Sequence, residues 1–246
     1  MARATDTVTR EIIKNALMSA ADTMALTVVR TARSAVIKHG MDFSTSIFTA
    51  EGEQVAQGLT LPPHLGSMAP ALEGVMNAFG DDVNPEDVFA NNDPYEGGSH
   101  LPDIFLFKPI FVNEALFGWS CCIGHQTDIG GRVAGGNACD NTEIYQEGLR
   151  IPPLKLYESG KPVQAIFDVI DRNVRVPGNV LGDLRAQLAA CHIRSTFRHA
   201  TRCRRSRLFS VLYPGRNNFH GSGSSWRVSF QRFRSELDLR FLRAAP

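Results

Sequence analysis

Residues 104–123 read IFLFKPIFVNEALFGWSCCI, and the fold prediction starts from this stretch. It holds two apolar runs, 104–112 and 116–123, with the triplet NEA between them. Two strand-like runs joined by so short a connection are typical of a β-hairpin. Proline has no backbone N–H to give to a sheet, so Pro109 predicts either an edge position or a bulge in the first strand.

Polar, turn-rich segments flank this hairpin on both sides: NNDPYEGGSHLPD at 91–103 and GHQTDIGG at 124–131. A two-residue turn centred on residues 113 and 114 would place His125 opposite Pro102, between His100 and Asp103. A bend at Pro102 would let His100 and Asp103 face the same point, although their spacing is odd. The sequence therefore predicts that two imidazoles and one carboxylate converge at the open end of the hairpin.

Two histidines and one carboxylate form a ligand set that leaves coordination positions open on a divalent ion such as Mn, Fe or Zn. Such an ion polarises a carbonyl or phosphoryl oxygen, or lowers the pKa of bound water from about 16 to about 7. His64, in PPHLGSM, is a candidate for contact with the substrate. Ordinary hydrogen bonding of loop histidines is the alternative. Nearby carboxylates are candidates for proton transfer or for orienting the ligands: Asp93, Asp128, Glu143 and Glu147.

The rest of residues 1–193 mixes helical and strand-like patterns. Helical spacing of apolar residues occurs at 8–33, 69–79, 163–172 and 178–198, and strand-like patterns occur at 42–57 and 86–91. The order shows no regular βαβ alternation. The prediction is therefore an α+β fold with a mixed or antiparallel sheet, a β-hairpin at the site and packed helices, followed by an irregular basic tail.

The composition is that of a globular protein, since 43% of the 246 residues are apolar and 21% are charged. No run approaches 18 consecutive apolar residues and no apolar signal segment opens the chain, so we expect no membrane span and a cytoplasmic location. Five cysteines without a Cys-x-x-Cys pair favour reduced thiols over disulfides or a zinc knuckle. The sequence has no phosphate-loop, dinucleotide-binding or nucleophile-elbow motif, so nucleotide chemistry would need a partner.

The charge changes sharply near residue 193. Residues 1–193 hold 14 basic and 23 acidic side chains, whereas residues 194–246 hold 12 arginines, no lysine and 2 acidic side chains. We therefore divide the chain into a region at 1–193 and an Arg/Ser-rich tail at 194–246. Arginines with interleaved aromatic residues make nucleic-acid binding an alternative function of the tail. The tail shows no basic helical stripe and no known nucleic-acid module, so that function is the weaker expectation.

Seven ordered blocks between residues 8 and 191 resemble the hydantoinase B/oxoprolinase family. The blocks are REIIKNALMSAADTM, RTARSAVIKHGMDFS, PPHLGSM, NNDPYEGGSHLPDI, GHQTDIGG, TEIYQEGLRIPP and GDLRAQLAAC. The family includes subunits of ATP-dependent hydantoinases and 5-oxoprolinases and of acetone and acetophenone carboxylases. In its carboxylase branch, the resemblance implies a manganese-type ion held by His100, Asp103 and His125, the three residues that the predicted hairpin also brings together.

The resemblance implies a metal-dependent subunit of an ATP-dependent cyclic-amide hydrolase of the hydantoinase or 5-oxoprolinase type. A hydantoinase A-type partner subunit would bind ATP and phosphorylate a substrate oxygen, and this subunit would supply the site where the activated species reacts. Asp128 or Glu143 would assist proton transfer there. The expected assembly is a hetero-oligomer that acts on a small cyclic amide, or on a ketone if the chain is an alpha-type subunit of a carboxylase.

Family subunits are longer than this chain, and the resemblance stops near residue 191. An Arg/Ser-rich segment without lysine that begins inside a helical pattern is typical of an out-of-frame translation. We therefore expect residues 194–246 to be non-native, through a frameshift or truncation, or disordered, and the chain to be an inactive fragment as one alternative. A non-haem iron oxygenase shares the ligand set, but the helix predicted at 8–33 does not suit an all-β oxygenase.

Overall fold

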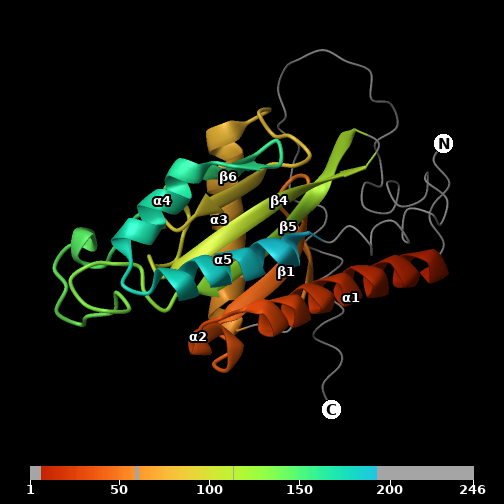
Figure 1. Cartoon of the computed structure of the whole chain (residues 1–246). Coiled ribbons are helices and arrows are strands. Elements are labelled where there is room, and N and C mark those ends of the chain that lie inside the picture. The colour runs from red at the N-terminus through yellow and green to blue at the C-terminus, as the bar shows by residue number, and fades with distance from the viewer. Residues whose placement is uncertain (1–6, 59–60, 113, 193–246) are drawn as a thin grey trace. The chain divides into compact units, whose positions relative to one another are not determined.

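An antiparallel β-sheet forms the centre of the molecule (Figure 1). The computed structural model describes residues 7–58, 61–112 and 114–192, so the predicted tail lies outside the described residues. Within them the sheet has seven strands in the order β2-β1-β5-β4-β3-β6-β7, and each neighbouring pair is antiparallel. The strands are β1 (Phe43–Thr49), β2 (Gln54–Gln57), β3 (Val88–Asn91), β4 (Asp103–Val112), β5 (Ala115–His125), β6 (Leu154–Glu158) and β7 (Lys161–Pro162).

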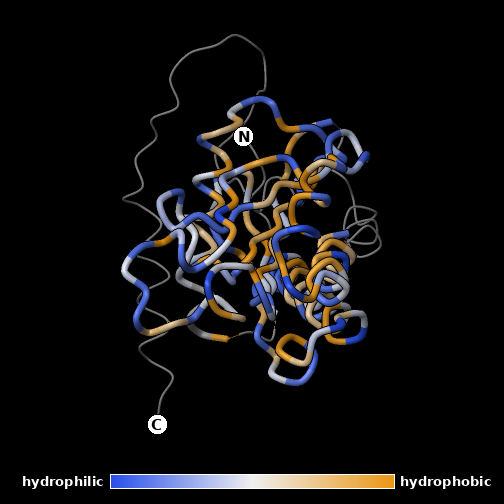
Figure 2. The backbone as a smooth tube through the Cα atoms, turned by 60° about the vertical axis from the view of Figure 1, so that its left-hand side comes forward, coloured by the Kyte–Doolittle hydropathy of each residue, from blue (hydrophilic) through white to orange (hydrophobic). Residues whose placement is uncertain are grey.

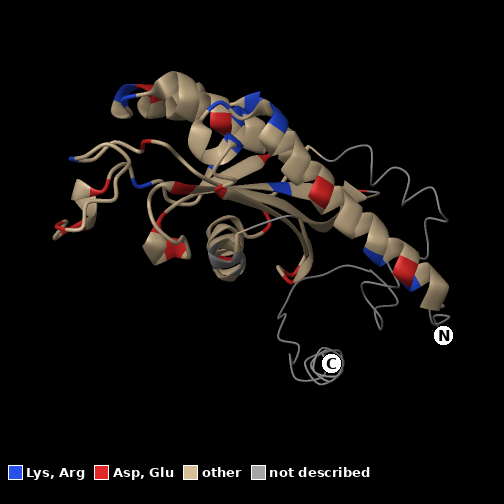
Figure 3. Cartoon of the chain, turned by 90° about the horizontal axis from the view of Figure 1, so that it is seen from below, with Lys and Arg blue, Asp and Glu red and all other residues tan. Residues whose placement is uncertain are grey.

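Helices cover both faces of this sheet. On one face α5 packs on β4 and β5, α1 packs on β1, β2 and α5, and α4 packs against α5; α3 lies on the other face. Figure 3 shows α3 end-on beneath the sheet, with the other long helices above it. The helices are α1 (Thr7–Thr31), α2 (Ala35–Lys38), α3 (Pro62–Phe79), α4 (Gln164–Asn173) and α5 (Pro177–Cys191), with short 3-10 turns η1 (Pro94–Glu96) and η2 (Ile144–Gln146). The predicted α+β class is confirmed.

Side chains alternate along the strands and divide the core into two layers. On β4, Ile104 and Leu106 join the layer under α1 and α5, whereas Phe105 and Phe107 join the layer under α3. Because both faces of the central strands are buried, their sequences read as nearly continuous apolar runs. Figure 2 shows the same pattern, with hydrophobic chain in the interior and hydrophilic chain in the outer loops.

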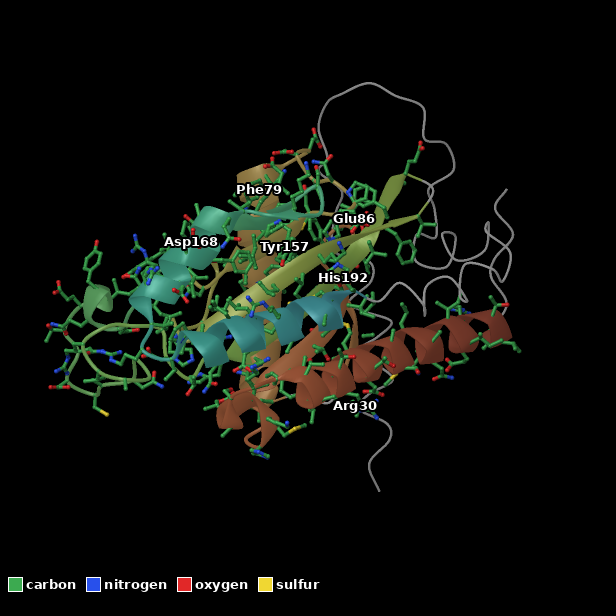
Figure 4. The ribbon with its side chains drawn as sticks, in the orientation of Figure 1. Arg30, Phe79, Glu86, Tyr157, Asp168 and His192 are labelled. Atoms are coloured by element: carbon green, nitrogen blue, oxygen red, sulfur yellow. The ribbon has the colours of Figure 1, made fainter. Side chains whose placement is uncertain are left out.

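Aromatic contacts join the outer elements to the sheet. Phe79, at the end of α3, lies 4.9 Å from Phe89 of β3, measured between ring centroids (Figure 4). On the other face, Tyr157 of β6 lies 5.8 Å from Phe167 of α4 (Figure 4). The tilted contact joins α3 to β3, and the edge contact joins α4 to β6. β6 and β7 were not among the expected strands.

The predicted hairpin is present, but its register differs from the expected one. The pairs next to the turn follow the prediction, and the ladder then shifts between Ile110 and Phe111. Beyond this bulge, His125 pairs with Asp103, so the predicted pairing with Pro102 is wrong. The prediction assumed an unbroken ladder, whereas a bulge puts one extra residue on one strand and moves every later pair by one.

Pro109 is accommodated in a central strand. β4 lies between β5 and β3, so the edge position is wrong; the ladder shift lies between Ile110 and Phe111, and its extra residue is on β5 rather than on the first strand. Pairing between β4 and β3 ends at Phe107, so the missing N–H of Pro109 removes no ladder hydrogen bond to β3.

Helix boundaries differ from the expected ones mainly at α3. This helix begins at Pro62 rather than at residue 69, and it continues through Pro70. Prolines in the first turn are tolerated because the N–H groups there have no partner within a helix. The early start adds a helical turn that carries His64.

By length and mean hydropathy, α1 is the one helix in the described part of the chain that meets the criteria for a membrane span. The core helix of a soluble protein meets the same criteria. Here Leu17, Met24 and Val28 are buried in the layer that α1 shares with α5 and the sheet. One side of α1 therefore packs into the core of the described residues.

Candidate metal centre

Three neighbouring strands bring polar side chains to one end of the sheet. Asp103 is the first residue of β4, and His125, the last residue of β5, is its direct partner in the ladder. Asp42 immediately precedes β1, and its carbonyl accepts a hydrogen bond from the His125 N–H at 3.0 Å. Directly opposed residues in antiparallel strands project from the same face. Asp103 and His125 therefore face the side of the sheet that α3 covers.

The Asp103 carboxylate is the centre of the resulting cluster. Its Oδ1 lies 3.0 Å from His100 Nε2 and 3.1 Å from His125 Nδ1. Its Oδ2 accepts a hydrogen bond from the Ser99 hydroxyl at 2.7 Å. The ring centroids of the two histidines are 5.0 Å apart. The structure thus brings together all three residues that the sequence nominated as metal ligands.

Hydrogen bonding keeps this carboxylate charged. Burial raises the pKa of Asp103, but hydrogen bonds from His100, His125 and Ser99 outweigh that effect and hold the pKa well below its ordinary value. The same hydrogen bond to Asp103 raises the pKa of His100, against the opposing effect of burial. The side chain of His100 is 40% exposed and that of Asp103 only 5%, so the cluster opens to solvent on the His100 side.

His64 adds a second imidazole–carboxylate contact. Its Nε2 lies 3.4 Å from Asp42 Oδ1 and 3.8 Å from Asp103 Oδ2. Its Nδ1 lies 3.0 Å from the Ser44 hydroxyl, whose oxygen already accepts a hydrogen bond from the Leu61 N–H. Ser44 can therefore donate to Nδ1, which places the imidazole proton on Nε2, facing Asp42. Burial lowers the pKa of His64, which favours this neutral ring.

Asn92 holds the loop that carries two of the ligands. Its side-chain amide donates to the carbonyl of Leu101 at 2.6 Å and to that of Leu149 at 3.0 Å. Its Oδ1 accepts from the Ile151 N–H at 2.6 Å, and its own N–H donates to the Ile151 carbonyl at 3.0 Å. Leu101 lies between His100 and Asp103, so this buried residue fixes the ligand loop against the segment before β6.

The other two residues predicted for proton transfer lie outside the cluster. Asp128 is buried in an ion pair with Arg175, whose Nη1 lies 2.9 Å from Oδ1 and whose backbone N–H donates to Oδ2. Glu143 precedes η2 and is exposed. In that segment Glu147 is the carboxylate that acts electrostatically on His100. Catalytic roles for Asp128 and Glu143 therefore stay predictions from the sequence.

Sequence reasoning missed Asp42 and Ser44. Their contribution depends on the pairing of β1 with β5, which joins segments far apart in the sequence and has no local signal. The place of His64 did have a signal, because Pro62 and Pro63 mark a helix start and would put His64 in the first turn.

The donor set fits a divalent ion. One ligand atom from each of His100, Asp103 and His125 lies within 4.8 Å of the other two. Bonds from a divalent ion to histidine nitrogen and carboxylate oxygen are about 2.0–2.2 Å long, so small side-chain rotations would let one ion reach all three atoms. Two nitrogens and one oxygen, with an exposed side at His100, leave room for further ligands.

Comparison with known proteins identifies the family. The sequence profile of hydantoinase B/oxoprolinase matches residues 6–198. The chain belongs to this family. Caprolactamase subunit beta of Pseudomonas jessenii is 40% identical over 188 residues, which cover 76% of this chain and 32% of that protein. A 5-oxoprolinase of Pestalotiopsis fici is 34% identical over 208 residues, which cover 75% of this chain and 16% of that protein.

Two solved structures share the fold of this family member. The crystal structure of the ATP-dependent caprolactamase from Pseudomonas jessenii matches with a TM-score of 0.78 and 37% identity, over 85% of this chain and 36% of that one. A nucleotide-free acetone carboxylase matches with a TM-score of 0.78 and 21% identity, over 85% of this chain and 28% of that one, and shows the fold alone. The chain thus spans about a third of the length of the caprolactamase subunit that it matches.

Proposed function

We propose that this chain is the metal-dependent subunit of an ATP-dependent cyclic-amide hydrolase. It would act on a small ring amide that a hydantoinase A-type partner subunit activates with ATP, within a cytoplasmic hetero-oligomer. The main support is the cluster of His100, Asp103 and His125 at the end of the β4–β5 hairpin. Relatives named as a caprolactamase subunit and a 5-oxoprolinase support the reaction class.

His100, Asp103 and His125 would hold Mn, Fe or Zn. When bound, such an ion supplies a positive charge that polarises the carbonyl oxygen of the activated substrate. The two imidazole nitrogens approach the same oxygen of Asp103, and when no ion is present each contact is a hydrogen bond to which the imidazole donates its own N–H. Binding of a divalent ion replaces protons at such a site, so metal affinity should rise with pH.

Asp42, oriented by His64, would accept a proton from the attacking water. His64 is buried, and its Nε2–H faces the Asp42 carboxylate and holds it in one orientation. The Asp42 side chain is one-third exposed beside the ligand cluster, at 33%, so a water molecule can reach it. In the proposed hydrolysis, Asp42 accepts one proton from water while the water oxygen bonds to the activated carbonyl carbon. The ring C–N bond then breaks, its electron pair stays on the nitrogen, and Asp42 returns the proton to that nitrogen; the acyl phosphate that remains releases phosphate by reaction with a second water.

The test combines the purified chain, loaded with Mn or Zn, with the purified ATP-binding partner. Ring opening and ATP hydrolysis are measured with caprolactam, hydantoin and 5-oxoproline as separate substrates. At least one ring should open only with ATP, and Asp42→Asn should slow that opening by about a hundredfold or more at unchanged metal content. Asp168→Asn, an exposed carboxylate on α4, is the matched control and should keep the wild-type rate.

Two results would contradict the proposal. One is the absence of ring opening for all three substrates by the metal-loaded pair of subunits. The other is a wild-type rate in the Asp42→Asn variant, which would remove Asp42 and His64 from the chemistry while leaving the metal ligands to be tested separately.

A further inference from the structure

Arg150 lies near two tyrosine rings. Its guanidinium carbon lies 5.8 Å from the ring centroid of Tyr95 and 6.0 Å from that of Tyr145. Its Nε pairs with Asp93 Oδ2 at 3.2 Å. Two cation–π contacts and an ion pair at Nε restrict the orientation of the guanidinium. We call Tyr95, Arg150 and Tyr145 the arginine clamp.

The outer side of the arginine clamp is open. Tyr95 is 76% exposed and Tyr145 is 75% exposed, which makes them the most exposed large hydrophobic side chains in the part of the chain that the structure describes. In the same part, the two Nη groups of Arg150 take part in none of the hydrogen bonds or ion pairs found. An oriented guanidinium whose Nη1–Nη2 edge is free can bind an oxyanion through two parallel hydrogen bonds.

The buried Asp93 carboxylate contacts both Arg150 and the segment that carries Tyr95. Its Oδ2 binds Arg150, and its Oδ1 accepts the backbone N–H of Tyr95 at 3.0 Å, which starts η1. Asp93 therefore joins the two parts of the clamp. Because it contacts Arg150 at Nε, the Nη edge of the guanidinium stays open to a ligand.

The loops that carry the arginine clamp are connected to the segments of the candidate metal centre. The Asp93 carbonyl accepts the Gly98 N–H at 2.8 Å, and His100 follows two positions later in this closed loop. On the other side, Arg150 precedes Ile151, which Asn92 binds through two hydrogen bonds. The loops after β3 and β5 lie at the same end of the sheet (Figure 1). The loop that carries Tyr95 thus continues into His100, and Glu147, two residues after Tyr145, acts electrostatically on His100.

We propose that the arginine clamp binds the phosphoryl group of the activated substrate while its carbonyl carbon lies at the metal centre. This assignment rests on the proposed function, in which ATP activates the substrate. A carboxylate also presents two oxygens to a guanidinium. The experiment therefore compares the binding of phosphate with that of a carboxylate. The tyrosine rings would keep the guanidinium oriented before the ligand arrives, so little ordering is left to binding.

The test is a titration of the full chain, depleted of metal, with inorganic phosphate and separately with acetate, followed by ³¹P and ¹H NMR. Metal depletion keeps phosphate from binding the ion. Arg150→Gln and Arg150→Lys should each weaken phosphate binding by about tenfold or more, because lysine keeps the charge but loses the planar fork. Arg172→Gln, which changes an exposed arginine on α4, is the matched control and should bind phosphate like the wild type.

The structure of the clamp gives a second set of variants. Tyr95→Phe keeps the ring and should keep phosphate affinity, whereas Tyr95→Leu with Tyr145→Leu should weaken it. Equal phosphate affinity in the wild type and both Arg150 variants would overturn the proposal, and so would tighter binding of acetate than of phosphate. Metal content is measured in every variant, and its retention in Arg150→Gln separates a failed clamp from a failed metal centre.

Discussion

Replacing Asn92 with alanine tests how firmly the ligand loop is held. The change removes three side-chain hydrogen bonds, to Leu101, Leu149 and Ile151, from a site with no solvent exposure. Each such bond contributes about 1 kcal/mol net, and an unsatisfied buried group costs about 1–3 kcal/mol. We therefore expect Asn92→Ala to lower the free energy of unfolding by about 3 kcal/mol, a large share of the stability of an ordinary domain.

The assay is urea unfolding of the full chain followed by far-UV circular dichroism. Asn173→Ala is the matched control, because Asn173 is exposed and its amide bonds only to Val169 in its own helix. That control should change stability by less than about 0.5 kcal/mol. A loss of under about 1 kcal/mol in Asn92→Ala would refute the reasoning, since it would mean that the three buried bonds do not hold the loop.

Further predictions concern packing and pH. Gly74→Ala in α3 should destabilise the fold by about 1–3 kcal/mol, because its new carbon would lie 2.3 Å from the Glu96 carbonyl oxygen. In the same helix, a carbon added by Gly66→Ala would have no atom within 4 Å, so this change should stabilise the fold by up to about 1 kcal/mol. Thermal unfolding of the two glycine variants measures the difference, and equal effects on stability would contradict the prediction. Asp87 is buried, and although burial raises its pKa, hydrogen bonds from the Ser159 and Asn84 N–H groups and from Lys155 lower it below the ordinary value. A depressed carboxyl pKa stabilises the fold above about pH 4, and that contribution is lost as pH falls further. Urea unfolding of Asp87→Asn should therefore show about 2 kcal/mol less stability at pH 7 and a flatter decline below pH 4, and a decline parallel to the wild type would show that Asp87 is not the titrating group.

The hairpin and the convergence of the three candidate ligands could be predicted because the information is local. Two apolar runs and a short connection between them set the pairing to within one residue. The remaining error came from the bulge at Ile110 and Phe111, where the ladder gains a residue on one strand. No residue pattern fixes where a bulge falls: Pro109 indicated an edge position or a bulge in the first strand, whereas the extra residue is on β5. The correct register puts His125 directly opposite Asp103.

The rest of the site depends on contacts between distant segments. Asp42 reaches the cluster because β1 pairs with β5, and Asp128 is drawn into an ion pair by Arg175, which lies just before α5. Neither partner is near in sequence. The short strands β6 and β7 were missed because Leu154–Glu158 is only half-buried and has no clear alternation of polar and apolar residues.

The metal content of the chain shows directly whether His100, Asp103 and His125 bind an ion. The full chain is dialysed against Mn, Zn or Fe, freed of unbound ion and measured by mass spectrometry of the metal, beside His125→Ala and the exposed control His192→Ala. We expect about one ion per chain in the wild type and in His192→Ala, and almost none in a folded His125→Ala. Equal metal content in wild type and His125→Ala, or no bound ion in the wild type, would contradict a centre built from His100, Asp103 and His125.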